Sequence, residues 1–325
     1  MEKYLEVKNL RTWFHTPEGI VKSVDGVSFH IDRGETLALV GESGCGKTVT
    51  SLSLIRLLAD TAELHTDYME VDGSEIGELT KEEARRLRGR QISMIFQEPM
   101  TSLNPVYKIE KQLGEVFRLH EPGISKKEVF ERSVDILKKV GVPKPEERLK
   151  VYPHQLSGGL RQRVMIAISL ASDPKMLIAD EPTTALDVTI QAQIIDLLKK
   201  LQADSNMAIL LITHDFGVVS QIANRVAVMY AGKIVEEGKL EDIFRDPWHP
   251  YTKMLILSIP GIKVTRGGRL EAISGTVPNP LHFPQGCRFA PRCPYAMEIC
   301  APVPPVETVS GSRRVSCHLR GNDNE

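Results

Sequence analysis

The chain has few cysteines, few aromatic side chains and almost no net charge. Of its 325 residues 5 are cysteines and 6% are aromatic, and 41 basic side chains are balanced by 42 acidic ones, for a formal net charge of −1. A chain so close to neutral has no general attraction to nucleic acid or to anionic lipid. Its 42% hydrophobic and 26% charged residues are typical of a globular protein, and its length allows one large domain and a smaller one.

Long apolar runs are also missing. The most apolar windows, VMIAISLA and MAILLI, are well short of the roughly 18–20 residues that a membrane-spanning helix requires. The first residues, MEKYLEVKNL, contain no basic stretch followed by an apolar one, so we expect no signal peptide. We therefore expect a cytosolic chain that does not cross a membrane. In that reducing compartment cysteines are more often metal ligands or redox groups than disulfides.

A glycine-rich loop predicts a phosphate-binding site. The strand pattern ETLALV (35–40) runs directly into GESGCGKT (41–48), which has the form G-x-x-x-x-G-K-[ST] and precedes the helix pattern TVTSLSLIRLL. In this context the backbone N–H groups of the loop and the helix N-terminus bind phosphate oxygens. We expect Lys47 to reach the β- and γ-phosphates and the Thr48 hydroxyl to bind Mg²⁺. The residues expected to contact the nucleotide here are Gly41, Ser43, Gly44, Cys45, Gly46, Lys47, Thr48 and Val49.

Two adjacent acids end a second strand pattern, KMLIAD (175–180). A short apolar run is typical of a parallel strand covered on both faces, with its chemistry at the carboxyl end. We expect Asp180 to hold Mg²⁺, directly or through water, and Glu181 to polarise an attacking water. Such a pair could also be merely solvated, but a phosphate loop about 130 residues upstream favours catalysis.

The stretch LSGGLRQRVMIAISLASDP (156–174) predicts a second anion site. The backbone N–H groups of Ser157, Gly158 and Gly159 open an apolar helix, whose N-terminus attracts negative charge. One nucleotide does not need two such sites on one chain, so we expect this one to serve a nucleotide held by another subunit. Together the motifs and their order resemble those of the nucleotide-binding subunits of ATP-binding cassette (ABC) transporters, over roughly residues 5–240.

The resemblance implies a P-loop α/β fold of the ABC type, with a RecA-like core, an antiparallel β subdomain and an α-helical subdomain at 97–175. It identifies a Walker A loop at 41–48, a glutamine loop from Gln97, a signature at 156–162, Walker B acids at 180–181, a D-loop at 185–187 and a switch histidine, His214. The sequence departs from the family at Leu160, where glutamine is usual. We expect the backbone anion site to survive this change and a side-chain contact to be lost or moved.

The same resemblance implies roles for individual side chains. Glu181 is the expected base, and His214 is expected to bond to the γ-phosphate and hold the attacking water. Gln97 is expected to contact Mg²⁺ or its water, while its loop senses a membrane partner. An aromatic ring after the first strand stacks on adenine in this family. Alignment favours Phe14, with Trp13 as the alternative; either ring could instead belong to the core.

Four cysteines gather near the end of the chain, at Cys287, Cys293, Cys300 and Cys317. Four thiolates suit a soft-metal centre, although no C-x(2–4)-C knuckle of a structural zinc site is present. The surrounding stretch resembles the C-terminal extension of oligopeptide and dipeptide importer ATPases, which implies a [4Fe–4S] cluster. Zinc, free thiols and disulfides remain alternatives. We expect two domains, 1–240 for nucleotide binding and 241–325 for an irregular, metal-binding extension.

The sequence thus predicts an ATPase that powers import of dipeptides or oligopeptides from the cytoplasmic face of a membrane. The resemblance implies a second, related ATPase in a heterodimer, two permease subunits and, indirectly, an extracytoplasmic peptide-binding protein. An importer of nickel or another small solute is an alternative within the family. A non-transport cassette ATPase is another, but the single cassette and neutral charge disfavour partners such as ribosomes or DNA. A regulatory module without ATP turnover is the third.

Overall fold

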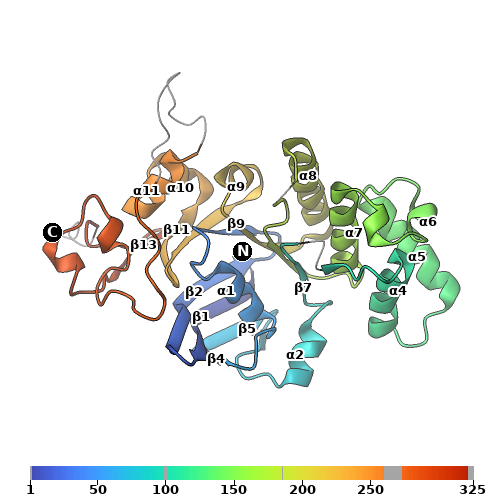
Figure 1. Ribbon diagram of the computed structural model, residues 1–325, viewed down its shortest axis with the longest axis horizontal. Helices are drawn as coiled ribbons and strands as arrows, with labels where there is room; N and C mark the ends of the chain where they lie inside the picture. The colour runs from blue at the N-terminus through green and yellow to red at the C-terminus, as the bar shows by residue number, and fades with distance from the viewer. Residues whose placement is uncertain (1, 99–101, 185, 260–272, 321–325) are drawn as a thin grey trace. The chain divides into compact units, whose positions relative to one another are not determined.

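The computed structural model describes residues 2–98, 102–184, 186–259 and 273–320 (Figure 1). The chain divides into two compact units, Met1–Glu78 with Leu211–Glu325, and Leu79–Leu210. The strand β9 (Ala208–Thr213) crosses from the second unit into the first.

The first unit contains an antiparallel sheet made by the N-terminal part of the chain. Its long strands β1 and β2 form a hairpin, β1 also pairs with β4 and β5, and β5 pairs with β6. The predicted antiparallel β subdomain is therefore present. The strands are β1 (Lys3–Thr16), β2 (Gly19–Asp32), β4 (Ala62–His65), β5 (Tyr68–Val71) and β6 (Ser74–Glu75).

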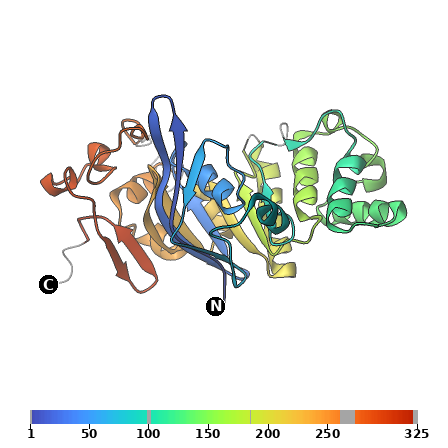
Figure 2. The same ribbon diagram turned by 90° about the horizontal axis from the view of Figure 1, so that it is seen from below.

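A second set of strands in this unit follows the order β12-β13-β11-β10-β3. The pair β3 and β10 is parallel, as expected of an α/β core, and the pairs toward the C-terminus are antiparallel. The terminal hairpin β12–β13, red in Figure 2, is thus added to the edge of β11. The strands are β3 (Thr36–Val40), β10 (Arg225–Tyr230), β11 (Lys233–Lys239), β12 (Glu307–Ser310) and β13 (Arg313–Ser316).

The core of this unit includes the C-terminal extension. Buried side chains of β3 and β10 pack in one cluster with residues of the helices and with Phe289, far along the chain. The Tyr230, Tyr251 and Phe289 rings lie 4.7–5.3 Å apart between centroids. The extension is therefore stabilised by packing on the sheet, as its low apolar content requires. The helices are α1 (Lys47–Leu54), α9 (Phe216–Ile222), α10 (Leu240–Arg245) and α11 (Pro250–Leu257), with 3₁₀ turns at Ala290–Arg292 and Glu298–Cys300.

The second unit is mostly helical, with the parallel pair β7 (Ile92–Ile95) and β8 (Met176–Asp180). Serine or aspartate side chains cap several of its helices, because their oxygens accept the first free backbone N–H groups: Ser125 caps α5, Ser157 caps α7 and Asp187 caps α8. The helices are α2 (Lys81–Leu87), α4 (Ile109–His120), α5 (Lys126–Lys139), α6 (Pro145–Arg148), α7 (Gly158–Leu170) and α8 (Val188–Ser205), with a 3₁₀ turn at Pro153–Gln155.

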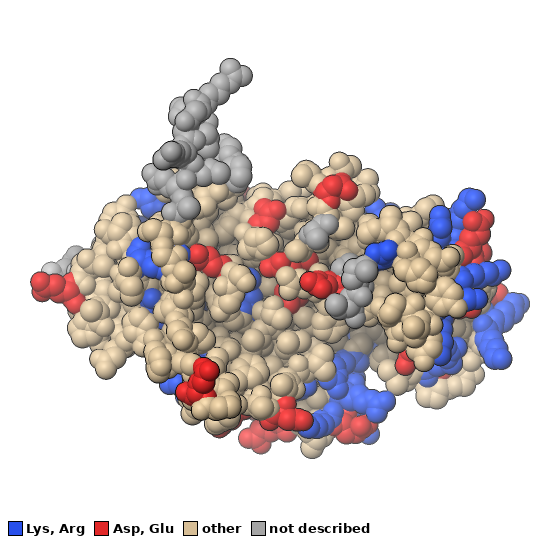
Figure 3. Space-filling view, viewed as in Figure 1, with Lys and Arg blue, Asp and Glu red and all other residues tan. Residues whose placement is uncertain are grey.

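Basic side chains gather over α4, α5 and α6 in Figure 3, with acidic side chains among them. Several form exposed ion pairs within this region, such as Lys127 with Glu131 and Lys144 with Glu147. Exposed pairs of this kind contribute little stability, and their mixed signs leave no uniform basic surface for nucleic acid.

One predicted helix is shorter than its pattern. The apolar pattern after the glycine loop extends to Leu58, but α1 ends at Leu54. Arg56 has a positive φ of 53°, a left-handed conformation that does not continue a helix. The apolar spacing continues past this point because Leu57 and Leu58 follow the turn, so the periodicity alone could not locate the end of the helix.

Candidate functional site

The glycine loop joins β3 to α1 and is pressed against two neighbouring strands of its unit. A Cβ on Gly41 would overlap the Met229 carbonyl oxygen, and one on Gly46 would overlap the Ser23 carbonyl oxygen. Gly46 also has a φ of +107°, where a side chain would be strained. Only glycine is compatible with both positions, so the close approach of the backbone explains the spacing of the motif.

Lys47, the first residue of α1, is buried and lies across the loop. Its ammonium group donates hydrogen bonds to the carbonyl oxygens of Gly41, at 2.8 Å, and of Glu42, at 2.9 Å. Ser43, Gly44 and Thr48 are exposed, Val49 is half-buried, and Cys45 and Gly46 are buried. The loop therefore presents part of its backbone and the Thr48 hydroxyl to a ligand, with the lysine held beside them.

Cys45 does not have the character of a redox thiol. It is buried inside the loop, and burial raises the pKa of its thiol despite the nearby Lys47 ammonium. A thiol with a raised pKa is a poor nucleophile, since the thiolate is the reactive form. Cys45 therefore serves the loop as a small buried side chain.

Gln97 and Glu181 meet in the second unit. They follow the neighbouring parallel strands β7 and β8, whose carboxyl ends share one edge. The Gln97 side-chain amide donates to the Glu181 carboxylate at 3.2 Å, and the Thr184 hydroxyl donates to it at 2.7 Å. Asp180 is buried at the end of β8. The structure thus brings the predicted amide and the predicted base together and orients the carboxylate.

The predicted second anion site is the exposed N-terminus of α7. Ser157 caps this helix, with its hydroxyl oxygen accepting the Leu160 backbone N–H at 3.4 Å. Ser157 and Gly158 are exposed, and a Cβ on Gly159 would meet the Ile190 side chain at 3.0 Å. Because Leu160 contributes its backbone to the cap, the departure from glutamine leaves the helix start intact.

The other predicted residues, His214 and Phe14 with its alternative Trp13, lie on other segments of the sequence. His214 is exposed directly after β9. Phe14 is half-buried in β1 and pairs with Val21 of β2. Its alternative, Trp13, is also half-buried, with the Lys22 ammonium 4.9 Å from the ring centroid. Ala185 of the predicted D-loop and residues 99–101 of the glutamine loop lie outside the described residues.

All four clustered cysteines line one cavity in the first unit. Cys287, Cys293, Cys300 and Cys317 surround it together with His249 and His318. All four are free thiols, and burial raises the pKa of Cys287 and Cys293 and raises that of Cys317 to about 11.

The structure nevertheless gives no support to the predicted metal-binding domain. Within the described ranges, no group of three or more His, Cys, Asp or Glu side chains could hold a metal ion. The expectations of zinc and of a [4Fe–4S] cluster are therefore unsupported at Cys287, Cys293, Cys300 and Cys317. The expected irregular texture also needs correction, because this region contains the regular hairpin β12–β13.

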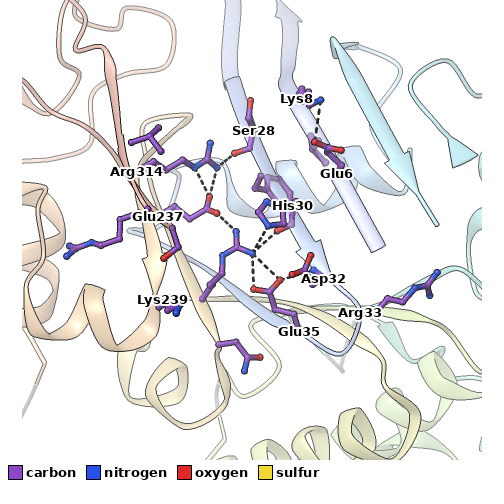
Figure 4. A pocket seen from close by; sticks show the side chains of 18 of the residues that line it. Glu6, Lys8, Ser28, His30, Asp32, Arg33, Glu35, Glu237, Lys239 and Arg314 are labelled. Carbon is purple, nitrogen blue, oxygen red and sulfur yellow. Dashed lines mark hydrogen bonds and ion pairs between the residues drawn. The ribbon is translucent and has the colours of Figure 1, made fainter. Parts of the chain in front are cut away.

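A larger cavity of about 790 Å³ lies elsewhere in the first unit, between β2, β11 and the C-terminal hairpin (Figure 4). Its charged groups bind one another. Arg225 donates to Glu35 at 2.8 and 3.0 Å and also to Glu237, which accepts from Arg314 as well. This chain of pairs joins the turn between β2 and β3 to β10, β11 and β13, so the charges that line the cavity are explained by the packing of these segments.

Sequence reasoning missed two residues that contact the phosphate loop. The Tyr251 hydroxyl oxygen accepts the Glu42 backbone N–H, and the Arg292 guanidinium donates to the Glu42 carboxylate. Both stand in the stretch that resembles the importer extension, but that resemblance implied no contact with the loop, and each is more than 200 positions from Glu42.

No helix of the described residues is long and apolar enough to cross a bilayer. Residues 24–184 match the family described as ABC transporter, and residues 235–300 match the family described as oligopeptide/dipeptide transporter, C-terminal region.

Curated relatives resemble the chain over nearly its whole length. The oligopeptide transport ATP-binding protein AppD of Bacillus subtilis is 50% identical over 98% of this chain and 97% of its own. The dipeptide transport ATP-binding protein DppD of Haemophilus influenzae is 48% identical over 98% and 96%. The oligopeptide transport ATP-binding protein OppD of Salmonella typhimurium is 50% identical over 96% and 92%.

Solved structures support the fold. The dimeric structure of the bacterial ABC transporter cassette MJ0796 is 27% identical, with a TM-score of 0.65, and covers 73% of this chain and 98% of that one. A post-hydrolysis state of the same cassette, bound to ADP and phosphate, is 28% identical with a TM-score of 0.64 and the same coverage. The α/β cassette fold with an antiparallel β subdomain is thereby confirmed. The chain belongs to the ABC transporter family, among its oligopeptide and dipeptide transport ATP-binding proteins.

Proposed function

We propose that the chain is the ATP-hydrolysing subunit of a peptide importer. The observation that carries this proposal is the match to peptide-transport ATP-binding proteins over 98% of the chain, C-terminal extension included. The phosphate loop, with Lys47 held across it, provides the part of the chain that such an activity requires. The transported solute would be a dipeptide or an oligopeptide.

The catalytic roles follow from the chemistry of the side chains. Glu181 acts as the base, and the hydrogen bonds from Gln97 and Thr184 support its orientation. Lys47 and Thr48 bind the phosphates and Mg²⁺, Asp180 binds Mg²⁺ and His214 bonds to the γ-phosphate. Mg²⁺ supplies charge neutralisation on the β- and γ-phosphates when it is bound.

We also propose that ATP is shared between two subunits. The exposed N-terminus of α7, opened by Ser157 and Gly158, is available to a phosphate on a partner chain. A related but different ATPase is the proposed partner, since the resemblance to peptide importers implies a heterodimer of two ATPase subunits. Two permease subunits would hold the pair at the cytoplasmic face of the membrane, and a peptide-binding protein would deliver the solute from outside.

The test replaces Glu181 with glutamine. The turnover of MgATP should fall by about 10²-fold or more because the base is lost, while ATP should still bind and should now retain the dimer in gel filtration. The matched control is Glu82→Gln, an exposed acid on α2 that should leave turnover unchanged. Normal turnover in Glu181→Gln would contradict the assigned role. Co-purification with ribosomes, and not with permease subunits, would contradict the transport function.

A soft-metal centre at the four-cysteine cavity is proposed from residue type alone, because the described side chains as they stand form no group that could hold a metal ion. Residue type supports this, since four thiols share one cavity and the C-terminal region matches that of the transporter family. A [4Fe–4S] cluster would act as a structural staple there. Its test is iron and sulfide analysis, with the visible spectrum, of anaerobically purified protein and of Cys300→Ser. Protein without iron or sulfide would refute the cluster.

A further inference from the structure

The phosphate loop is held from outside by an arginine of the C-terminal extension. The two terminal nitrogens of Arg292 donate to the two Glu42 carboxylate oxygens, at 2.7 and 2.9 Å, in a fork. The Arg292 side chain is 4% exposed and that of Glu42 is 29% exposed. Arg292 also donates to the Ser274 carbonyl oxygen, at 2.9 Å, and to the Tyr230 hydroxyl, at 3.3 Å. The arginine is therefore held by the extension, through Ser274, and by β10, through Tyr230, as well as by the loop.

A second contact fixes the backbone of the same loop residue. The Tyr251 hydroxyl oxygen accepts the Glu42 backbone N–H at 2.9 Å. Tyr251 is fully buried, and burial raises the pKa of its hydroxyl, so the group stays neutral. Glu42 is thus held by its side chain and its backbone at once, which leaves it little freedom to change conformation.

A second arginine of the extension, Arg288, also connects the extension to the phosphate loop. Arg288 donates to the Ala231 carbonyl oxygen at 2.5 Å and pairs with Asp25. Gly232, the residue after Ala231, donates its backbone N–H to the Cys45 carbonyl oxygen of the loop at 2.9 Å. Both arginines lie between Cys287 and Cys293, so one short segment of the extension supports the loop at two points.

Glu42 in turn determines where the lysine of the loop lies. Its carbonyl oxygen accepts one of the two hydrogen bonds that the Lys47 ammonium donates to backbone carbonyls of the loop, at 2.9 Å. A displaced Glu42 would move that acceptor, and the lysine would lose its fixed position beside the phosphate site. Holding these groups in place before ligand arrives reduces the ordering cost of binding.

We propose that Arg292 is a positioning residue for nucleotide binding. It acts through Glu42 on Lys47 and on the loop backbone. The extension thereby completes the phosphate site of its own chain. The inference rests on nucleotide binding at the loop and does not depend on peptides being the transported solute.

The test measures MgATP affinity and turnover in Arg292→Ala, with fluorescent ATP analogue as the binding probe. The dissociation constant and KM should rise about tenfold, within the usual range for coupling between sites, while kcat at saturating MgATP changes less than twofold. The matched control is Arg313→Ala, another buried arginine of the extension, which pairs with Glu236 on β11. It should lose stability with unchanged affinity.

Two further variants separate positioning from general packing. Arg292→Lys keeps one charge without the fork and should restore part of the affinity. Glu42→Gln should weaken binding to a similar degree, and its combination with Arg292→Ala should add little, because both remove one interaction. Glu42→Gln also decides the case if the Arg292 variants fail to fold, since its side chain is partly exposed. Unchanged affinity in the folded variants, or an equal loss in Arg313→Ala, would overturn the proposal.

Discussion

Replacing Arg225 with methionine tests the buried ion network of the first unit. Arg225 lies at the start of β10, with its side chain 13% exposed, between Glu35 at 7% and Glu237 at 5%. Burial by itself lowers the pKa of the guanidinium, but Glu237 and Glu35 outweigh that effect and raise it. The charge is therefore stabilised in the fold by its two carboxylates.

The size of the effect follows from what the variant leaves behind. Methionine restores apolar contact but removes the cation between two buried carboxylates, and breaking a buried pair in this way costs about 3–5 kcal/mol. Glu237 keeps Arg314 as a partner, so Glu35 carries most of the loss. Adding Glu35→Gln to Arg225→Met removes that buried charge and should recover part of the stability.

The assay is urea unfolding followed by circular dichroism at neutral pH. Because the pairs are buried, the difference between Arg225→Met and the native chain should persist at high salt. The matched comparison is Lys3→Met, which removes an exposed ion pair with Glu6 and should change stability by less than about 1 kcal/mol. A loss below about 1 kcal/mol in Arg225→Met, or no recovery in the double variant, would refute the reasoning.

Three further predictions concern other parts of the chain. Gly46→Ala should abolish nucleotide binding, measured by analogue titration, because a Cβ there would overlap the Ser23 carbonyl; retained binding would contradict the loop geometry. Ser157→Ala should cost about 1 kcal/mol of stability as a lost helix cap and also abolish ATP-driven dimers, whereas Ser125→Ala, the cap of α5, should cost stability alone. Burial first, and then Arg225, lowers the pKa of His30 from its usual 6.5, while Glu237, Asp32 and Glu35 oppose the shift. The unfolded chain therefore binds the extra proton, so stability should fall as pH drops below about 6.5, and His30→Gln should show a smaller fall in urea titrations.

Local signals in the sequence were sufficient for the motif-bearing segments. The apolar run before the glycine loop is β3, the apolar run of KMLIAD is β8, and the helix expected to open at Ser157 to Gly159 is α7. These predictions succeeded because each depends on neighbouring residues: the steric demands of glycine and the burial of consecutive apolar side chains.

Contacts between distant segments could not be predicted in this way. Arg292 and Glu42 are 250 positions apart, and nothing in the local sequence of either one names its partner. The hairpin β12–β13 was missed because each of its four-residue strands has a single apolar residue and therefore no apolar alternation. Both features arise from packing of the extension on the sheet, which composition does not record.

The hairpin β12–β13 has a consequence for any shortened form of this protein. It pairs with β11 through Glu236 and Glu237, so it covers hydrogen-bonding groups that would otherwise stand open along that strand. A cassette cut after residue 240 would keep its motifs but expose the edge of β11. Exposed strand edges pair with strands of other molecules. Aggregation of such a truncated cassette during purification would then result from the absence of the hairpin β12–β13, and not from misfolding of the nucleotide-binding motifs.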